Sequence, residues 1–395
     1  MNFSNPESFD IKLVRQGPLF RYQRQCRLIK SDHELSIGRR IFIAILITWV
    51  PIMVFALLQG QLFHHADPLL RHFGVHSRCL IAIPLLILAE GLAESLMPMI
   101  VEEFAKSGLV GEEQIPAFRQ AIENAKSLLD SLIAFIVIVV GSMLIAVVAL
   151  THISDIHEIA WAIDPPGQDL GSLGLAGWWF VLVSRPIFCI LVGCWLWRLV
   201  CLFVFFRSVT KLDLTLAPTH PDQVGGLGFL EEAVVIFVPV VLALSVVLAS
   251  NWAHNVLYHD VHVVTLKSPA ILYVILVLGV FLSPWLAFMP ALKKFGREAR
   301  FAYGALLVKH GQLVDRRWIK GEALQQDGLL SAPEIGPIAD VASIYAVVEG
   351  IRTVPLRKKA VIQLAVAALL PLIPVYAIEV PIKNLLKQLA GALFV

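Results

Sequence analysis

The amino-acid sequence predicts an all-α integral membrane protein: a bundle of about seven transmembrane helices with a small helical cytoplasmic layer. Hydrophobic residues make up 57% of the 395 residues and charged residues only 16%, which lies outside the range of soluble domains. Seven apolar stretches are each long enough to cross a bilayer, for which a helix needs about 20 residues. Lys and Arg gather in alternate connecting segments, so the charges agree on one orientation.

The spans expected from the sequence cover residues 41–63, 79–100, 130–151, 178–205, 232–250, 269–291 and 360–379. With the amino terminus inside and the carboxyl terminus outside (N-in/C-out), cytoplasmic segments hold 25 of the 32 Lys and Arg residues and outer segments hold 5. The other two, Arg185 and Arg198, lie within the fourth span. Positive charge accumulates on the cytoplasmic side of membrane proteins, which favours this topology. Pro371 and Pro374 leave a re-entrant hairpin as the alternative for the last span.

Four regions follow from this reading. They are a basic cytoplasmic N-terminal segment (1–40), a six-helix transmembrane region with cytoplasmic helical extensions (41–291), a cytoplasmic helical segment (292–358), and a seventh transmembrane helix with an amphipathic tail (359–395). Apolar residues at helical spacing after Pro116 predict that the third helix begins in the cytoplasm before it enters lipid. A helical projection is also expected after the sixth span, as far as His310. Apolar residues from Ile338 to Val348 share one helical face and are expected to pack on the cytoplasmic helix ends or on a neighbouring subunit.

Two acidic residues lie one helical turn apart in the second span. Glu90 and Glu94 share one face near the middle of the expected span, where an ionised side chain is costly and faces a bundle interior or water. Two carboxylates this close resist joint ionisation, which suits a cation or proton path. The alternative is an internal ion pair with Arg185 or Arg198, because both arginines also need a counter-charge in lipid.

Histidines are concentrated on the expected outer face, which holds nine of the twelve. A divalent metal site or a pH sensor could be built from His64, His65, His152, His157, His254, His259 and His262 with neighbouring carboxylates. No spacing among them matches a metal motif, so scattered interfacial histidines are the alternative. No cofactor is predicted.

A glycine-rich loop joins the fourth and fifth spans on the cytoplasmic side. It contains His220, Asp222, Gly225, Gly226 and Gly228 and runs into a helix. Such a loop exposes backbone N–H groups that can hold an anion. The alternative is a structural loop in which Asp222 caps the backbone. His220 and Asp222 could also be drawn as a catalytic dyad, although no nucleophile is evident beside them.

Two stretches resemble a group of uncharacterised bacterial multi-pass inner-membrane proteins. The first runs from Thr219-His220-Pro221-Asp222 to Gly225-Gly226-Leu227-Gly228-Phe229-Leu230, and the second from Ile338 through Pro355 to Pro371 and Pro374. The resemblance covers most of the chain from about residue 40 onward and implies a bacterial inner-membrane location without an activity. Gln223 and Val224 depart from the pattern, in which small residues are usual.

The function expected from these observations is that of a channel-like or transporter-like protein that moves an ion or small solute. Glu90 and Glu94 would line the path, and Arg185 and Arg198 would balance their charge. The alternative is a non-transporting sensor or scaffold with a histidine-rich outer face, and a membrane-embedded enzyme is the third possibility. The expected partners are the lipid bilayer and further copies of the chain in a homo-oligomer. No nucleic-acid-binding module is present, and topology explains the basic residues.

Overall fold

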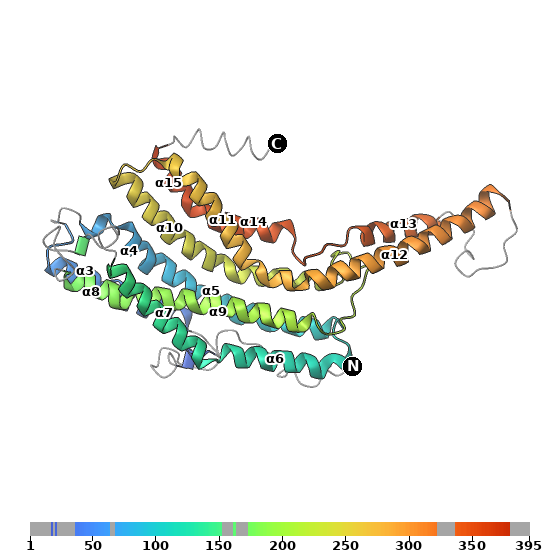
Figure 1. Cartoon of the computed structure of the whole chain (residues 1–395), viewed down its shortest axis with the longest axis horizontal. Coiled ribbons are helices and arrows are strands. Elements are labelled where there is room, and N and C mark those ends of the chain that lie inside the picture. The colour runs from blue at the N-terminus through green and yellow to red at the C-terminus, as the bar shows by residue number, and fades with distance from the viewer. Residues whose placement is uncertain are drawn as a thin grey trace.

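The computed structural model describes residues 17–18, 20–21, 36–63, 68–151, 161–162, 173–321 and 336–379. These residues form an all-helical structure (Figure 1). Among the described residues, seven helices are long and apolar enough to cross a membrane, the same number as the sequence predicts. Their bounds are Ile37–Leu58, Phe73–Lys106, Glu112–Ala146, Leu175–Val209, Leu227–Tyr258, Val263–Phe281 and Lys358–Glu379.

Most spans are built from more than one helical element. The first four spans contain α2 (Ile37–Thr48) and α3 (Val50–Leu58); α4 (Phe73–Ser77), η3 (Arg78–Ala82) and α5 (Ile83–Lys106); α6 (Ile115–Leu129) and α7 (Leu132–Thr151); and α8 (Leu175–Trp179), η7 (Phe180–Ser184) and α9 (Arg185–Val209). The others contain η8 (Leu227–Phe237) and α10 (Val238–Tyr258); η9 (Val263–Leu266) and α11 (Lys267–Phe281); and α14 (Lys358–Leu369), η13 (Leu370–Leu372) and α15 (Ile373–Glu379). Between the last two spans lie η10 (Ser283–Phe288), α12 (Met289–Val314), η11 (Asp315–Ile319) and α13 (Gly336–Glu349).

Prolines explain where the helix type changes. The π-helical turns η3 and η7 are each followed by an α-helix with proline at its second position, Pro84 and Pro186. The 3₁₀ segments η8 and η10 likewise lead into helices with Pro239 and Pro290 at that position. Proline lacks an N–H group and clashes with the carbonyl four residues earlier, so the preceding turn must widen or tighten.

The bundle has two unlike ends (Figure 1). We call the end that carries α6, α12 and α13 the basic end, because Lys126, Arg207, Lys211 and Lys294 lie there, and the opposite end the far end. Helices α12 and α13 pack side by side and extend beyond the ends of α5, α6 and α9 (Figure 1). We call this pair the arm. At the base of the arm Val348 and Ile351 pack with Ala299.

The last span runs the whole length of the bundle. At the basic end the backbone N–H of Arg357 donates to Glu231 Oε2 at 3.0 Å. At the far end the Glu379 carboxylate accepts from the backbone N–H of Val263, also at 3.0 Å. Since α14, η13 and α15 all pack along α10, the alternative of a re-entrant hairpin is wrong.

The third span begins with α6, well before its most apolar part, and continues as α7 after a short break between Leu129 and Leu132. One other expectation needs correction. The sixth span was expected to reach residue 291, but α11 ends at Phe281 and the tighter segment η10 follows, which contains Pro284. Both breaks are local: Asp130 accompanies the first, and a proline that cannot complete the α-helical bond pattern accompanies the second.

Candidate functional site

A buried cluster of three charged side chains joins three spans near the basic end. Arg40 comes from the first turn of α2, Glu90 from α5 and Arg198 from α9. Glu90 accepts one hydrogen bond from Arg40 Nη2 and another, of 2.9 Å, from Arg198 Nη2. Glu90 is completely buried, and Arg40 and Arg198 are only 4% and 6% exposed. We call these three residues the triad.

The triad lies at the basic end of the first span, where Arg40 is in the first turn of α2, but Glu90 lies at the middle of the longer helix Phe73–Lys106 that forms the second span. Trp195, one turn before Arg198, packs edge-on against Phe237 with ring centroids 6.0 Å apart, and Phe237 packs on Phe281. Phe237 is the last residue before α10, and Phe281 is the last residue of α11. Glu90 lies about 26 Å along its helix from Phe73, which approaches the thickness of the hydrocarbon layer, about 30 Å.

The two arginines are not equivalent. The guanidinium group of Arg198 also lies over the Trp195 ring, 4.7 Å from its centroid, and a cavity of about 30 Å³ adjoins it. Among the described residues, Nη1 of Arg198 and Nη1 of Arg40 have no hydrogen-bond partner. Within the triad, two positive groups therefore face one carboxylate, and each arginine keeps an unused donor.

Aromatic side chains fill the bundle on the basic-end side of the triad. Phe206 contacts both Trp285 and Phe288, with ring centroids 5.9 and 5.3 Å apart, and all three are fully buried. The Trp285 indole N–H donates to the Leu230 carbonyl at 2.9 Å. These buried rings therefore occupy the centre of the bundle between the triad and the basic end.

The sequence-predicted charged residues divide into two groups. Glu90 and Arg198 meet in the triad, which agrees with the alternative hypothesis of an internal ion pair. Glu94 and Arg185 are both partly exposed and lie outside it. Arg185 lies 13 residues before Arg198 on the same helix, or about 20 Å away, too far to reach Glu90. Of the two carboxylates of the second span, Glu90 belongs to the triad and Glu94 does not.

The glycine-rich loop folds around the carboxylate of Asp222. Its two oxygens accept hydrogen bonds from the N–H groups of Val224 (2.9 Å), Gly226 (3.0 Å) and Gly228 (2.8 Å). Gly226 has φ +99°, a conformation that favours glycine. His220 Nδ1 lies 2.8 Å from Asp222 Oδ1. The chain thus supplies its own anion to these N–H groups, so in this structure the Asp222 carboxylate fills the place that a bound anion would take.

The protonation of Asp222 follows from these contacts. Burial by itself raises the pKa of Asp222, but the hydrogen bonds from Val224, His220, Gly228 and Gly226 together outweigh burial and leave the pKa below its usual value of 3.8. Asp222 is therefore ionised at neutral pH, and its charge holds the loop closed.

Arg352 fastens this loop to the segment between α13 and α14. Its Nη2 donates to the Asp222 carbonyl at 2.7 Å, and its backbone N–H donates to the Gln223 carbonyl at 2.8 Å. Arg352 Nη1 also bonds the Leu356 carbonyl. Arg352 thereby joins the loop to the base of the arm through both its side chain and its backbone.

The described histidines of the far end take part in packing. His72 and His254 are buried with their ring centroids 4.5 Å apart, and His254 Nδ1 bonds the Arg71 carbonyl at 3.1 Å. His259 packs on His254, and His262 Nδ1 lies 3.5 Å from Glu379 Oε1. The other candidates, His64, His65, His152 and His157, lie outside the described residues. Within the described residues, no three His, Cys, Asp or Glu side chains are placed to hold a metal ion.

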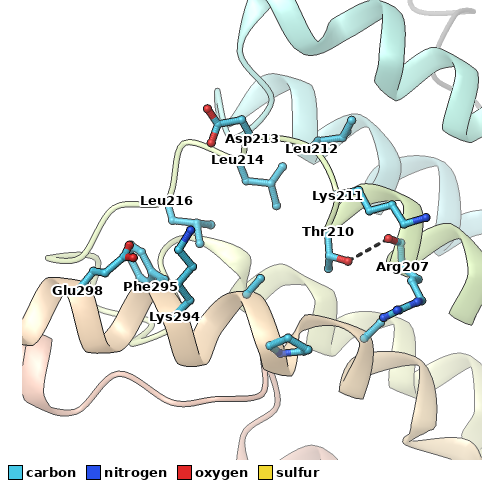
Figure 2. A pocket seen from close by; sticks show the side chains of 13 residues that line it. Arg207, Thr210, Lys211, Leu212, Asp213, Leu214, Leu216, Lys294, Phe295 and Glu298 are labelled. Atoms are coloured by element: carbon cyan, nitrogen blue, oxygen red, sulfur yellow. Dashed lines mark hydrogen bonds between the residues drawn. The ribbon is translucent and has the colours of Figure 1, made fainter.

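A pocket of about 520 Å³ opens at the basic end between α9 and α12 (Figure 2). Arg207 and Lys211 lie on one side of it, and Lys294 and Glu298 lie on the other. Leu216 and Phe295 contribute apolar surface. This pocket is not evident in the sequence, because its walls come from segments about 80 residues apart.

The burial of two further arginines, Arg40 and Arg78, was not predicted from the sequence, where they were counted among the charges that set topology. Arg40 belongs to the triad. Arg78 is 5% exposed, and its guanidinium group lies 5.3 Å from the Phe180 centroid and 5.5 Å from that of Phe188. In the sequence both arginines lie at the edge of an apolar stretch, and this position is the feature that could have indicated their burial.

In a comparison with known proteins, no family model, no curated protein and no solved structure matches this chain.

Proposed function

We propose that this chain is a membrane-embedded docking scaffold whose basic end faces the cytoplasm. The seven apolar helices support insertion in a membrane. The gathering of Lys and Arg at one end supports the N-in/C-out orientation. The resemblance of the glycine-rich loop to bacterial inner-membrane proteins favours that membrane, and a homo-oligomer stays a prediction.

The arm is the observation that carries the proposal. It extends past the rest of the basic end, and its exposed face carries large apolar side chains: Phe301 is 76% exposed and Val308 is 60% exposed. These residues are separated by seven positions with the exposed Ala305 between them, so they lie on one helical stripe. An apolar stripe in water is typical of a binding surface.

The rigid base of the arm supports the same function. Arg352 joins it to the Asp222 loop, and Ile351 packs with Ala299 of α12. A partner bound to the stripe would therefore be held at a fixed position relative to the membrane. Arg297 lies one turn before Phe301, and Lys309 follows Val308. An amphipathic helix with acidic residues beside its apolar face would complement this surface.

The closed centre of the bundle weighs against transport through Glu90. The carboxylate is fully buried between two guanidinium groups, and fully buried aromatic rings fill the adjacent space. A proton or cation path would need water or exchangeable groups on both sides of Glu90. The triad is better understood as a clamp that fixes α2, α5 and α9.

The test places a photo-crosslinking amino acid at Phe301 in the full-length chain in its native membrane. We expect one discrete protein adduct, which a second substitution, Val308→Glu, removes. Ala302→Glu is the matched control, because Ala302 is also exposed on α12 but lies about 100° round the helix from Phe301. An unaltered adduct pattern in Val308→Glu, or no adduct with any protein, would contradict the docking function.

Anion transport is a second candidate, which the triad's excess positive charge favours over the cation or proton path suggested by the sequence. Arg40 and Arg198 each keep a donor without a partner among the described residues, and the cavity beside Arg198 has room for a water or a chloride ion. Chloride and potassium flux would be compared in proteoliposomes, with Arg198→Gln as the variant. Chloride flux that Arg198→Gln abolishes, in protein that still elutes as a folded species, would replace the scaffold with a transporter.

A further inference from the structure

The pocket between α9 and α12 is bordered by charged residues that have no ion-pair partner among the described residues. Arg207, Lys211 and Lys294 supply positive charge, and Asp213 and Glu298 supply negative charge. The three cations come from both sides of the opening and leave about 520 Å³ between them (Figure 2). Three cations without an ion-pair partner, placed on both sides of one pocket, can attract an anionic group into it.

Helix α9 carries an apolar stripe that leads to the pocket. Leu196, Val200 and Val204 are all exposed and lie four residues apart; Arg207 follows them in the last turn of α9, and Lys211 lies just after the helix ends. The stripe therefore changes from apolar to basic within one turn. A membrane protein shows this change where the hydrocarbon layer meets the headgroups.

The opposite wall repeats the pattern. Leu286 of η10 is 45% exposed, and Pro290 and Lys294 follow at intervals of four residues. The contacts of Phe206 with Trp285 and Phe288 place this part of η10 beside the end of α9. The two stripes thus change from apolar to basic side by side, where the end of α9 contacts η10. The pocket lies on the basic side of this change.

We propose that the pocket binds the headgroup of a phospholipid from the leaflet at the basic end. Arg207, Lys211 and Lys294 would hold its phosphate, and the acyl chains would lie along the exposed residues of α9 and η10. Basic pockets between transmembrane helices are suited to lipid headgroups. The site requires only that the bundle lies in a membrane, so it does not depend on the docking function of the arm.

The acidic residues define which phospholipid fits. Asp213 and Glu298 present carboxylate oxygens at the mouth of the pocket, which need hydrogen-bond donors or a cation. The hydroxyl groups of a glycerol headgroup and the ammonium group of ethanolamine both donate hydrogen bonds. The trimethylated ammonium of choline has no N–H. The pocket therefore selects phosphatidylglycerol and phosphatidylethanolamine over phosphatidylcholine.

The experiment is native mass spectrometry of the full-length protein in detergent, titrated with each of these three lipids. We expect phosphatidylglycerol and phosphatidylethanolamine to bind and phosphatidylcholine to bind at least about tenfold more weakly, a difference of about 1.4 kcal/mol. The double variant Arg207→Gln/Lys294→Gln should lose at least about tenfold in affinity for the first two lipids. Asp213→Asn/Glu298→Gln should reduce the discrimination against phosphatidylcholine while keeping binding.

The matched control is Lys309→Gln, which removes one exposed positive charge from α12 outside the pocket and should change binding less than about twofold. All substituted residues are exposed, so equal thermal unfolding midpoints will show that the variants fold. Equal lipid retention by wild type and the double variant would overturn the proposal. Displacement of the lipid by millimolar glycerol phosphate or inorganic phosphate would also overturn it, because the site would then bind a soluble phosphate.

Discussion

Two buried carboxylates, Asp222 and Glu90, take their hydrogen bonds from different kinds of partner. Asp222 takes its hydrogen bonds from N–H groups two to six residues further along its own loop. Glu90 takes its hydrogen bonds from Arg40 and Arg198, which lie 50 and 108 residues away on other spans. The first arrangement shapes a loop, and the second fixes three helices against one another. Loss of Glu90 should therefore affect the whole bundle, and loss of Asp222 mainly the loop and the base of the arm.

The largest effect is expected from Glu90→Ala. It leaves two buried guanidinium groups without a counter-charge, which should cost about 3 to 5 kcal/mol of stability. The measurement is the thermal unfolding midpoint in detergent. Glu102→Ala is the control, because Glu102 lies on the same helix in an exposed pair with Lys106 and should cost less than about 0.5 kcal/mol. Equal midpoints for the two variants would show that the triad stabilises the protein no more than the exposed Glu102–Lys106 pair does.

The arginines should differ from each other. Arg198→Met loses the Glu90 hydrogen bond and the contact with the Trp195 ring, whereas Arg40→Met loses only its bond to Glu90. Arg198→Met should therefore be less stable than Arg40→Met by about 1 kcal/mol, the usual size of a partly desolvated cation–π contact. Unfolding midpoints of the two variants measure this difference. The reverse order would mean that the ring contact contributes nothing.

Asp222→Asn should have an intermediate and local effect. Replacement of the carboxylate weakens its charged hydrogen bonds at a cost of about 1 to 3 kcal/mol. We expect faster proteolysis near Arg352, measured by limited digestion, with little change in the unfolding of the spans. Cleavage of the spans and the loop at equally increased rates would show that the loop is not a separate unit.

The Asp222 loop should also respond to acid. Because the folded pKa of Asp222 is lowered, its stabilising contribution is complete above the unfolded value and is lost as the pH falls through the folded pKa. Hydrogen exchange of the Val224, Gly226 and Gly228 amides, corrected for its intrinsic pH dependence, should show constant protection above about pH 4 and loss below it. Asp222→Asn should abolish this dependence.

The smallest effect is expected at the glycines. Gly226→Ala places a side chain at φ +99°, which should cost about 1 to 2 kcal/mol. Gly311→Ala is the opposite case, because Gly311 lies within α12 with open space around it and alanine favours a helix by about 0.5 to 1 kcal/mol. Unfolding midpoints should move in opposite directions in the two variants. A gain in stability from Gly226→Ala would contradict the loop geometry.

Features whose interacting residues lie close together in the sequence could be predicted from it, whereas contacts between residues far apart in the sequence could not. The seven spans and the projection after the sixth depend on local apolar patterns, and both were predicted. The capping role of Asp222 was among the alternatives, because its partners lie within six residues. Arg198 was named as one possible partner of Glu90, but Arg40 was counted as a topogenic charge. Only the packing of three distant helices distinguishes a buried arginine from an interfacial one.

The most direct test of the clamp is a double-mutant cycle between Glu90 and Arg198. We expect Glu90→Ala/Arg198→Met to unfold at a higher temperature than Glu90→Ala alone, because the second substitution removes a buried charge that has lost its partner. The coupling energy should exceed about 1 kcal/mol. If the two substitutions add to within about 0.5 kcal/mol and the double variant is the least stable, Glu90 and Arg198 do not form the clamp.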